Sequence, residues 1–247
     1  GTMSLEYRLD GAGARTVVLS GSLGTTIEMW ERQLRALTPR FAVLRYHHPG
    51  HGRSHLPEER SVAAFAHEVV RLLDALGLER VSFCGVSLGG AVGMQLALDA
   101  PERLEALVLG CTSARFATPE FWEERAAAVR AGGVEAIADV VVERWFTPAF
   151  PDVPRYRQML ASTPAEGYAR CSEALRDYDL RGALGPVRAP TLAIAGADDP
   201  VSPPDQLQAI VDEIAGARLL VLDHARHLAN VERADEFNYA LLAQLEP

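Results

Sequence analysis

Short apolar runs alternate with segments of helical periodicity along most of this chain. The apolar runs favour buried strands, and apolar residues spaced three and four apart favour amphipathic helices. Strands are predicted over residues 16–20, 41–46, 80–84, 104–110, 191–196 and 218–222. Helices are predicted over residues 25–36, 61–76, 90–98, 204–214 and 229–245. This alternation is typical of an α/β domain with a mainly parallel sheet and helices on both of its faces.

The interval from residue 115 to residue 180 breaks this alternation. Helical patterns cover residues 119–131, 134–144 and 166–176, and glycine or proline residues separate them. A helical insertion between two strands favours a cap over the carboxyl edge of the sheet, where open parallel sheets bind ligands. We therefore predict a core of residues 1–114 and 181–247 and an inserted helical cap, or lid, of residues 115–180.

Composition narrows the class of protein. The chain has 247 residues, 48% of them hydrophobic, which is enough to bury one sizeable core. Its formal net charge of −9 disfavours binding to nucleic acid or to an anionic membrane, so an anionic substrate would need a local cationic group. The apolar runs are too short to cross a bilayer, and the N-terminus has no signal pattern. We therefore expect a soluble, cytoplasmic protein.

Several mechanisms are excluded or disfavoured by residue type. The sequence has no lysine, which removes Schiff-base chemistry, a phosphate-loop lysine and a Ser–Lys dyad. The histidines form no paired helical motif with nearby carboxylates, so neither a metal site nor a cofactor is predicted. The three cysteines, Cys84, Cys111 and Cys171, are widely spaced, and we expect them to be reduced and mostly buried.

Residues 85–89 have the pattern Gly-x-Ser-x-Gly and join a predicted strand to a predicted helix. At such a turn the serine has a strained backbone, and a side chain on either flanking glycine would crowd it. This strand–turn–helix context is the one that exposes a nucleophilic serine. Ser87 is therefore the candidate nucleophile, and a purely structural glycine turn is the alternative.

A serine nucleophile needs a base, and the base needs an acceptor that orients it. In this class of sheet the order along the chain is Ser, then Asp or Glu, then His. Asp199 is the preferred acid because Pro200 starts a rigid turn after it, and Asp198 is the alternative. His227 is preferred over His224 as the base because it lies closer to the start of the final predicted helix.

The oxyanion that forms on an attacked carbonyl group needs pre-aimed donors, and backbone N–H groups are the usual source. Leu88 follows the nucleophile and supplies one donor. The loop after the first strong strand should supply the second, with Leu23 as the choice and Ser22 as the fallback. A simple glycine turn is the alternative interpretation of that loop.

Further segments carry a resemblance to known proteins. They are residues 22–26 with Met29 and Trp30, the glycine loop 46–54, residues 144–147, residues 166–168, and His227 with residues 230–234. Over nearly its whole length the chain resembles the α/β-hydrolase fold enzymes and, within them, the 3-oxoadipate enol-lactonases of aromatic catabolism. It departs from them in the glycine loop, usually Asp-x-Arg-Gly-His-Gly, where His47, His48 and Pro49 occupy the first three positions. That departure leaves the floor of the pocket undefined.

The resemblance implies hydrolysis of a small, carboxylate-bearing enol-lactone to 3-oxoadipate through a Ser–His–Asp triad and an acyl-enzyme. It also implies a cationic anchor in the cap. Trp122 and Arg125 share one face of a predicted helix, so Arg125 can hold a carboxylate beside an aromatic wall that Trp145 closes. Arg144 is the rival anchor. Alternatively, the two tryptophans join the cap to the core and Arg125 is a solvated surface charge.

Other activities of the same fold stay open: a carboxylesterase, another lactonase, a carbon–carbon bond hydrolase, or a ligand sensor with little turnover. A serine nucleophile disfavours dehalogenase and epoxide hydrolase relatives, whose nucleophile is typically aspartate. The expected partner is a small acidic lactone, with neither nucleic acid nor a membrane. The oligomeric state is open, as is a decarboxylase domain of the kind fused to some relatives.

Overall fold

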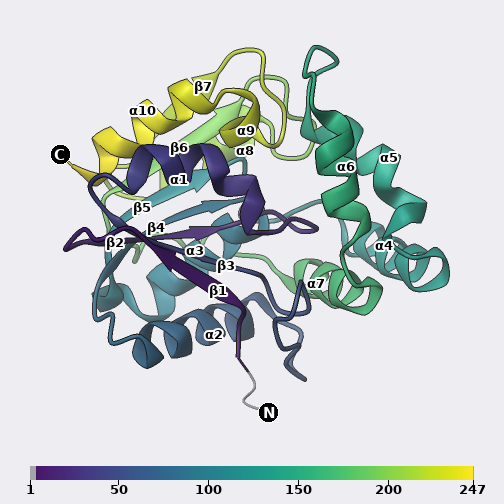
Figure 1. Ribbon diagram of the computed structural model, residues 1–247, viewed down its shortest axis with the longest axis horizontal. Coiled ribbons are helices and arrows are strands. Elements are labelled where there is room, and N and C mark those ends of the chain that lie inside the picture. The colour runs from purple at the N-terminus through teal and green to yellow at the C-terminus, as the bar shows by residue number, and fades with distance from the viewer. Residues whose placement is uncertain (1–3, 247) are drawn as a thin grey trace.

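One mostly parallel sheet forms the centre of the protein (Figure 1). The computed structural model describes residues 4–246, so residues 1–3 and 247 of the predicted core lie outside the described residues. Within residues 4–246 the sheet has seven strands in the order β1-β3-β2-β4-β5-β6-β7. The strands are β1 (Tyr7–Asp10), β2 (Thr16–Ser20), β3 (Ala42–Tyr46), β4 (Val81–Val86), β5 (Leu104–Gly110), β6 (Thr191–Gly196) and β7 (Arg218–Leu222). The prediction of a mainly parallel sheet is confirmed.

The interior strands were predictable because both of their faces are covered. Every residue of β2, β4 and β6 is buried, and such strands form continuous apolar runs in the sequence. Sequence analysis missed β1, which pairs antiparallel with β3 at the edge of the sheet. This strand has only four residues, and Tyr7 and Leu9 on it are exposed. It therefore has no buried apolar run that the sequence could reveal.

Helices cover both faces of the sheet. In Figure 1, α1 (Glu31–Leu37) and α10 (Ala234–Leu245) lie on one face, and α2 (Val62–Ala75) and α3 (Leu88–Asp99) lie on the other. Helix α8 (Pro204–Glu213) packs against β6 and β7. No helix among residues 4–246 is both long and apolar enough to cross a membrane.

Two predicted helices are interrupted. The helix predicted over residues 25–36 begins as the 3-10 turn η1 (Ile27–Trp30) and continues as α1. The helix predicted over residues 229–245 is divided into α9 (Ala229–Glu232) and α10, because Arg233 leaves the helical region with φ −125° and ψ 53°. No proline or glycine marks either break, so the sequence carried no signal for it.

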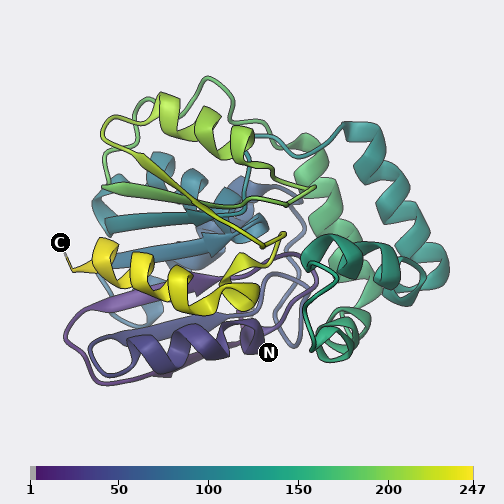
Figure 2. The ribbon, with the colours of Figure 1, turned by 90° about the horizontal axis from the view of Figure 1, so that it is seen from above.

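Four α-helices and one 3-10 turn separate β5 from β6 and gather at one end of the sheet (Figures 1 and 2). They are α4 (Pro119–Gly132), η3 (Val134–Ile137), α5 (Ala138–Trp145), α6 (Val153–Ala161) and α7 (Ala165–Asp177). Sequence analysis missed α6, because the prolines before it were interpreted as a break. Pro154 in fact occupies the first turn of α6, where its missing N–H is tolerated.

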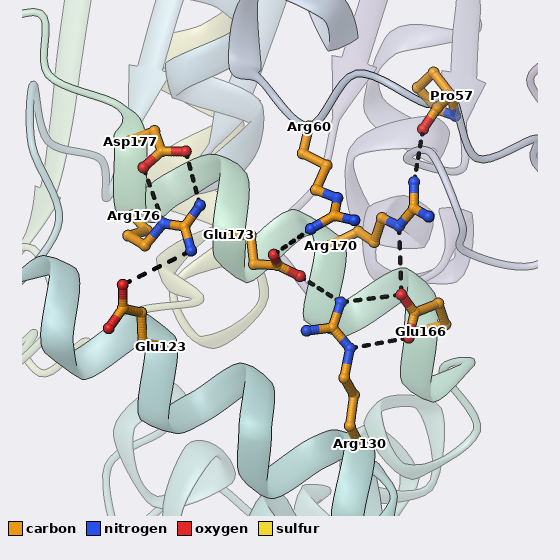
Figure 3. A network of polar contacts seen from close by, with 9 residues as sticks. All are labelled: Pro57, Arg60, Glu123, Arg130, Glu166, Arg170, Glu173, Arg176 and Asp177. Atoms are coloured by element: carbon orange, nitrogen blue, oxygen red, sulfur yellow. Dashed lines mark hydrogen bonds and ion pairs between the residues drawn. The ribbon is translucent and has the colours of Figure 1, made fainter.

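Ion pairs hold the outer surface of these helices together (Figure 3). Arg130 on α4 binds the carboxylates of Glu166 and Glu173 on α7. Arg60, in the segment before α2, binds the second oxygen of Glu173 at 2.6 Å. The same carboxylate therefore connects two helices of the insertion to the core.

All three cysteines are buried and unpaired, as predicted. Burial raises the pKa of each thiol above its ordinary value, because a thiolate would lose its hydration. The cysteines therefore pack as small apolar side chains.

Candidate active site

Ser87 lies on a strained turn between β4 and α3. Its φ of 58° and ψ of −115° lie in a region that side chains rarely adopt. A Cβ added at Gly85 would lie 2.1 Å from the carbonyl oxygen of Gly89, and one added at Gly89 would lie 1.9 Å from that of Ser20. Both flanking glycines are therefore required by space, and the turn is held in place by its neighbours.

The fold brings Ser87, His227 and Asp199 into one hydrogen-bonded chain. The Oγ of Ser87 lies 2.7 Å from Nε2 of His227, and Nδ1 of His227 lies 2.8 Å from Oδ2 of Asp199. All three side chains are buried. Oδ1 of Asp199 accepts from the backbone N–H groups of Val201 and Ser202, at 2.8 and 3.1 Å. These bonds aim one carboxylate oxygen at the imidazole.

The alternative residues lie elsewhere. Asp198 is exposed, and its backbone N–H donates to the carbonyl of Ala225 at 2.9 Å. His224 is also exposed and has a φ of 56° in the loop after β7. Neither side chain contacts Ser87 or His227. The course of the backbone in these two loops therefore places Asp199 and His227 at Ser87 and leaves Asp198 and His224 exposed.

Two backbone N–H groups beside Ser87 are free to donate. Within residues 4–246, no protein group accepts from the N–H of Leu23 or from that of Leu88. Leu88 is the first residue of α3, where a helix leaves its donors unpaired and its dipole favours negative charge. The N–H of Gly89 donates to the carbonyl of Gly21 at 3.0 Å, which ties the serine turn to the Leu23 loop. The N–H of Ser22 is free by the same criterion.

A cavity of about 230 Å³ opens between the sheet and the inserted helices. Ser87, His227 and Leu23 lie on its core side, and Trp122, Arg125, Arg144 and Trp145 line it from α4 and α5. The residues predicted for the nucleophile, the base and the substrate pocket thus surround one cavity.

Two arginines at this cavity have no carboxylate partner. Within residues 4–246, no Asp or Glu oxygen lies within 4.0 Å of the guanidinium group of Arg125 or Arg144. Both groups lie beside the Phe121 ring, at 4.9 Å for Arg125 and 5.6 Å for Arg144. Arg125 also donates to the hydroxyl of Tyr168 at 3.5 Å. The contact between Phe121 and Arg125 spans four residues of α4 and could have been predicted from the helical spacing, whereas the contact between Phe121 and Arg144 joins α4 to α5 and leaves no local signal.

The two tryptophans form apolar walls. Trp122 and Trp145 are both buried, and the indole N–H of Trp122 donates to the carbonyl of Phe116 at 2.7 Å. Because that donor is already used, Trp122 offers a bound molecule a ring surface and no polar contact. The tryptophans therefore line the cavity and also pack the insertion against the core.

The base and the insertion are joined through the backbone. The N–H of His227 donates to the carbonyl of Arg144 at 3.3 Å, and the N–H of Leu228 donates to that of Trp145 at 3.1 Å. The end of α5 thus contacts the loop that carries the imidazole, so displacement of α5 would disturb both the cavity wall and His227.

Other histidines gather near the site without forming a metal centre. His48 and His51 are buried below the Leu23 loop, and each uses Nε2 for a backbone hydrogen bond. No group of three His, Cys, Asp or Glu side chains within residues 4–246 is placed to hold a metal ion.

Comparison with known proteins identifies the family of this chain. The family model described as alpha/beta hydrolase fold matches residues 15–234. The 3-oxoadipate enol-lactonase 2 of Acinetobacter baylyi is 36% identical over 99% of this chain and 94% of its own length. A putative carbamate hydrolase, RutD, of Agrobacterium fabrum is 30% identical over 96% of this chain and 95% of its own. The crystal structure of the enol-lactonase from Burkholderia xenovorans superimposes with a TM-score of 0.95 at 38% identity, covering 98% of this chain and 96% of that one. The predicted fold class and the resemblance to enol-lactonases are confirmed, and the chain belongs to the alpha/beta hydrolase fold family.

Proposed function

We propose that this protein is a serine hydrolase that opens a small, carboxylate-bearing enol-lactone, converting 3-oxoadipate enol-lactone to 3-oxoadipate. One observation carries the proposal: the Ser87–His227–Asp199 chain opens into a cavity with two guanidinium groups that have no carboxylate partner among residues 4–246. The similarity to enol-lactonases over nearly the whole length supports the same substrate. In this proposal residues 115–180 act as the cap over that cavity.

Acylation follows from the distances. His227 takes the proton of Ser87 across 2.7 Å, and the serine oxygen attacks the lactone carbonyl carbon. The N–H groups of Leu23 and Leu88 donate to the oxyanion, with the Ser22 N–H as the alternative to Leu23. Collapse of the tetrahedral intermediate breaks the ring C–O bond and releases an enolate oxygen, which takes the proton from His227. The resulting enol then tautomerises to the ketone.

Deacylation uses the same groups in reverse. His227 removes a proton from water, the hydroxide attacks the acyl-enzyme, and the proton returns to Ser87 as the ester bond breaks. Asp199 accepts from Nδ1 of His227, which holds the imidazole in the tautomer whose Nε2 is free to accept the proton of Ser87.

The cap supplies recognition of the substrate carboxylate. Arg125 is the proposed anchor, since a guanidinium group can hold a carboxylate through two parallel hydrogen bonds. Arg144 shares the Phe121 ring with it and is the rival. Trp122 and Trp145 bury the apolar part of the lactone.

The same proposal places the enzyme in the degradation of aromatic compounds in the cytoplasm. The three buried, unpaired thiols support a reducing compartment. The acidic lactone is its partner in this setting, and no nucleic acid or membrane takes part.

A second candidate activity is hydrolysis of a carbamate, which the similarity to putative carbamate hydrolases favours. A carbamate could use the same serine relay. It differs in the chemistry of its leaving group, so a substrate comparison separates the two activities.

The test is a substrate panel with the wild type and Ser87→Ala. It contains the enol-lactone, its non-enol isomer muconolactone, a neutral aryl ester, a simple carbamate and a dienoic ring-cleavage product. We expect the highest kcat/KM for the enol-lactone. A higher kcat/KM for the carbamate or the ring-cleavage product would reassign the substrate, and near-full lactonase activity of Ser87→Ala would overturn the covalent mechanism.

A further inference from the structure

Three buried rings, one at the end of β3 and two in the loop after it, contact one another in sequence near the loop formed by residues 21–24. The ring centroids of Tyr46 and His48 are 5.4 Å apart, and those of His48 and His51 are 5.9 Å apart, both in edge-to-face contact. Each ring is at most 4% exposed. We call this set the ring ladder. The mechanism proposed above uses none of its members.

Each ring has one polar atom within hydrogen-bonding distance of the segment formed by residues 20–24, which contains Leu23. The hydroxyls of Tyr46 and Ser20 lie 2.6 Å apart. Nε2 of His48 lies 2.6 Å from the carbonyl oxygen of Gly21, and the N–H of Gly24 donates to Nε2 of His51 at 3.0 Å. The ladder thus binds the chain on both sides of Ser22 and Leu23.

These partners define the protonation of each imidazole. A carbonyl can only accept, so His48 carries its proton on Nε2. A backbone N–H can only donate, so Nε2 of His51 is bare and its proton lies on Nδ1, which donates to the carbonyl of Pro49 at 3.1 Å. Burial lowers the pKa of His48 to about 4 and that of His51 to about 3, so both rings are neutral at neutral pH.

The ladder also explains why the N–H of Leu23 is left free. The carbonyl of Gly21 accepts from both His48 and the N–H of Gly89, and the carbonyl of Ser22 accepts from the hydroxyl of Thr25 at 2.7 Å. With the N–H of Gly24 held by His51, the N–H groups of Ser22 and Leu23 between these contacts have no acceptor within residues 4–246. Because Gly89 belongs to the serine turn, the carbonyl of Gly21 joins the ladder to the nucleophile.

We propose that His48 and His51 are positioning residues that hold the loop of residues 21–24 so that the N–H of Leu23 faces the oxyanion. This inference rests on the acyl-transfer mechanism proposed above. It gives a role in catalysis to two histidines of the glycine loop 46–54, His48 and His51. Neither imidazole touches the substrate, so the effect should appear in binding of the transition state and not in binding of the ground state.

The test compares His51→Leu, which removes the acceptor, with His51→Gln, whose amide oxygen can replace Nε2. His67→Leu on α2 is the matched control, because His67 is exposed and outside the site. Turnover of 4-nitrophenyl acetate reports kcat without depending on the identity of the lactone. Inhibition by phenylboronic acid, which forms a tetrahedral adduct with a serine, is compared with inhibition by benzamide, which does not.

We expect His51→Leu to lower kcat and the affinity for the boronic acid by about 10- to 100-fold, with little change in benzamide affinity and recovery in His51→Gln. His48→Leu should behave in the same way, and His51→Asn replaces His51→Leu if the latter does not fold. A kcat for His51→Leu within about twofold of the wild type would overturn the inference, as would equal losses of affinity for both inhibitors. Near-full activity of Ser87→Ala in the same assay would instead overturn the mechanism on which the inference rests.

Discussion

The arginines of the inserted helices fall into two groups with opposite surroundings. On the outer surface, Arg130 binds two carboxylates, and Arg170 shares one of them (Figure 3). At the cavity, Arg125 and Arg144 have aromatic neighbours and, within residues 4–246, no carboxylate within 4.0 Å. All four come from one short stretch of a chain whose net charge is −9. Other arginines among residues 4–246 also lack a carboxylate within 4.0 Å, but Arg125 and Arg144 line the cavity that contains Ser87.

This contrast separates arginines that stabilise the fold from arginines that are available to bind a substrate carboxylate. Exposed ion pairs contribute little, about 0 to 1 kcal/mol each, because water screens the charges and the side chains lose freedom. A guanidinium group that borders a cavity and lacks a partner is available to an incoming carboxylate, to which hydrogen bonds are stronger. A position at the cavity together with the lack of a carboxylate partner therefore distinguishes Arg125 and Arg144 from the other arginines of the inserted helices.

The largest effect should come from removing the nucleophile while leaving both groups of arginines intact. Ser87→Ala should lower kcat by about 10⁴-fold or more, because the serine and its base act as a unit. The same variant should bind a small dicarboxylate, used as a product analogue, with wild-type affinity in calorimetry. Loss of that binding would mean that anion recognition depends on Ser87 and that the cavity arginines do not act separately.

The next largest effect should come from the cavity group. Arg125→Met should raise KM for the acidic lactone by about 10- to 100-fold, the loss expected for a hydrogen bond to a charged group, and leave kcat/KM for a neutral aryl ester nearly unchanged. Steady-state kinetics on both substrates measure the difference. Arg144→Met is the matched variant: a larger rise in KM for this variant would make Arg144 the anchor. Equal losses of kcat/KM on the acidic and the neutral substrate in both variants would show that neither arginine anchors the carboxylate.

A smaller effect is expected on the outer surface. Arg130→Met should lower the free energy of unfolding by about 1 kcal/mol, since Arg130 and Glu166 are partly exposed and the buried Glu173 keeps its ion pair with Arg60. It should leave KM for the acidic lactone unchanged. Denaturant unfolding and kinetics on one preparation test both parts. A rise in KM comparable to that of Arg125→Met would show that the ion-paired arginines affect substrate binding as much as the cavity arginines do.

The smallest effect is the pH dependence of the outer pairs. Hydrogen bonding to Arg130 lowers the pKa of Glu166 from its ordinary value of 4.5. A lowered pKa means that this pair stabilises the fold above about pH 4.5 and that the contribution is lost as pH falls through the folded-state value. The difference in unfolding free energy between the wild type and Arg130→Met should therefore shrink from pH 7 to pH 3.5. A constant or growing difference over that range would show that the pair does not contribute through charge.

The interior strands of the sheet and the serine turn could be predicted from the sequence alone. Strands such as β2 and β4 are covered on both faces, so the constraint of burial acts on every residue and is visible as an apolar run. A Cβ at either glycine beside Ser87 would lie only about 2 Å from a backbone atom, so glycine is required at both positions. The motif is therefore visible in the sequence. Edge strand β1 and the break at Arg233 escaped prediction, because neither leaves a local trace in apolar pattern or in glycine and proline.

The contacts between polar groups follow from the packing of the folded chain and could not be predicted from the local sequence. Asp198 and Asp199 are adjacent and chemically alike, and the direction of the loop after β6 alone places one of them beside His227. His51 reaches the N–H of Gly24, which lies 27 positions earlier in the chain. Arg125 and Arg130 stand on one helix, yet one borders the cavity without a carboxylate and the other binds two. Hydrogen bonds and ion pairs depend on distances of a few ångströms between residues far apart in sequence, and local patterns contain no record of those distances.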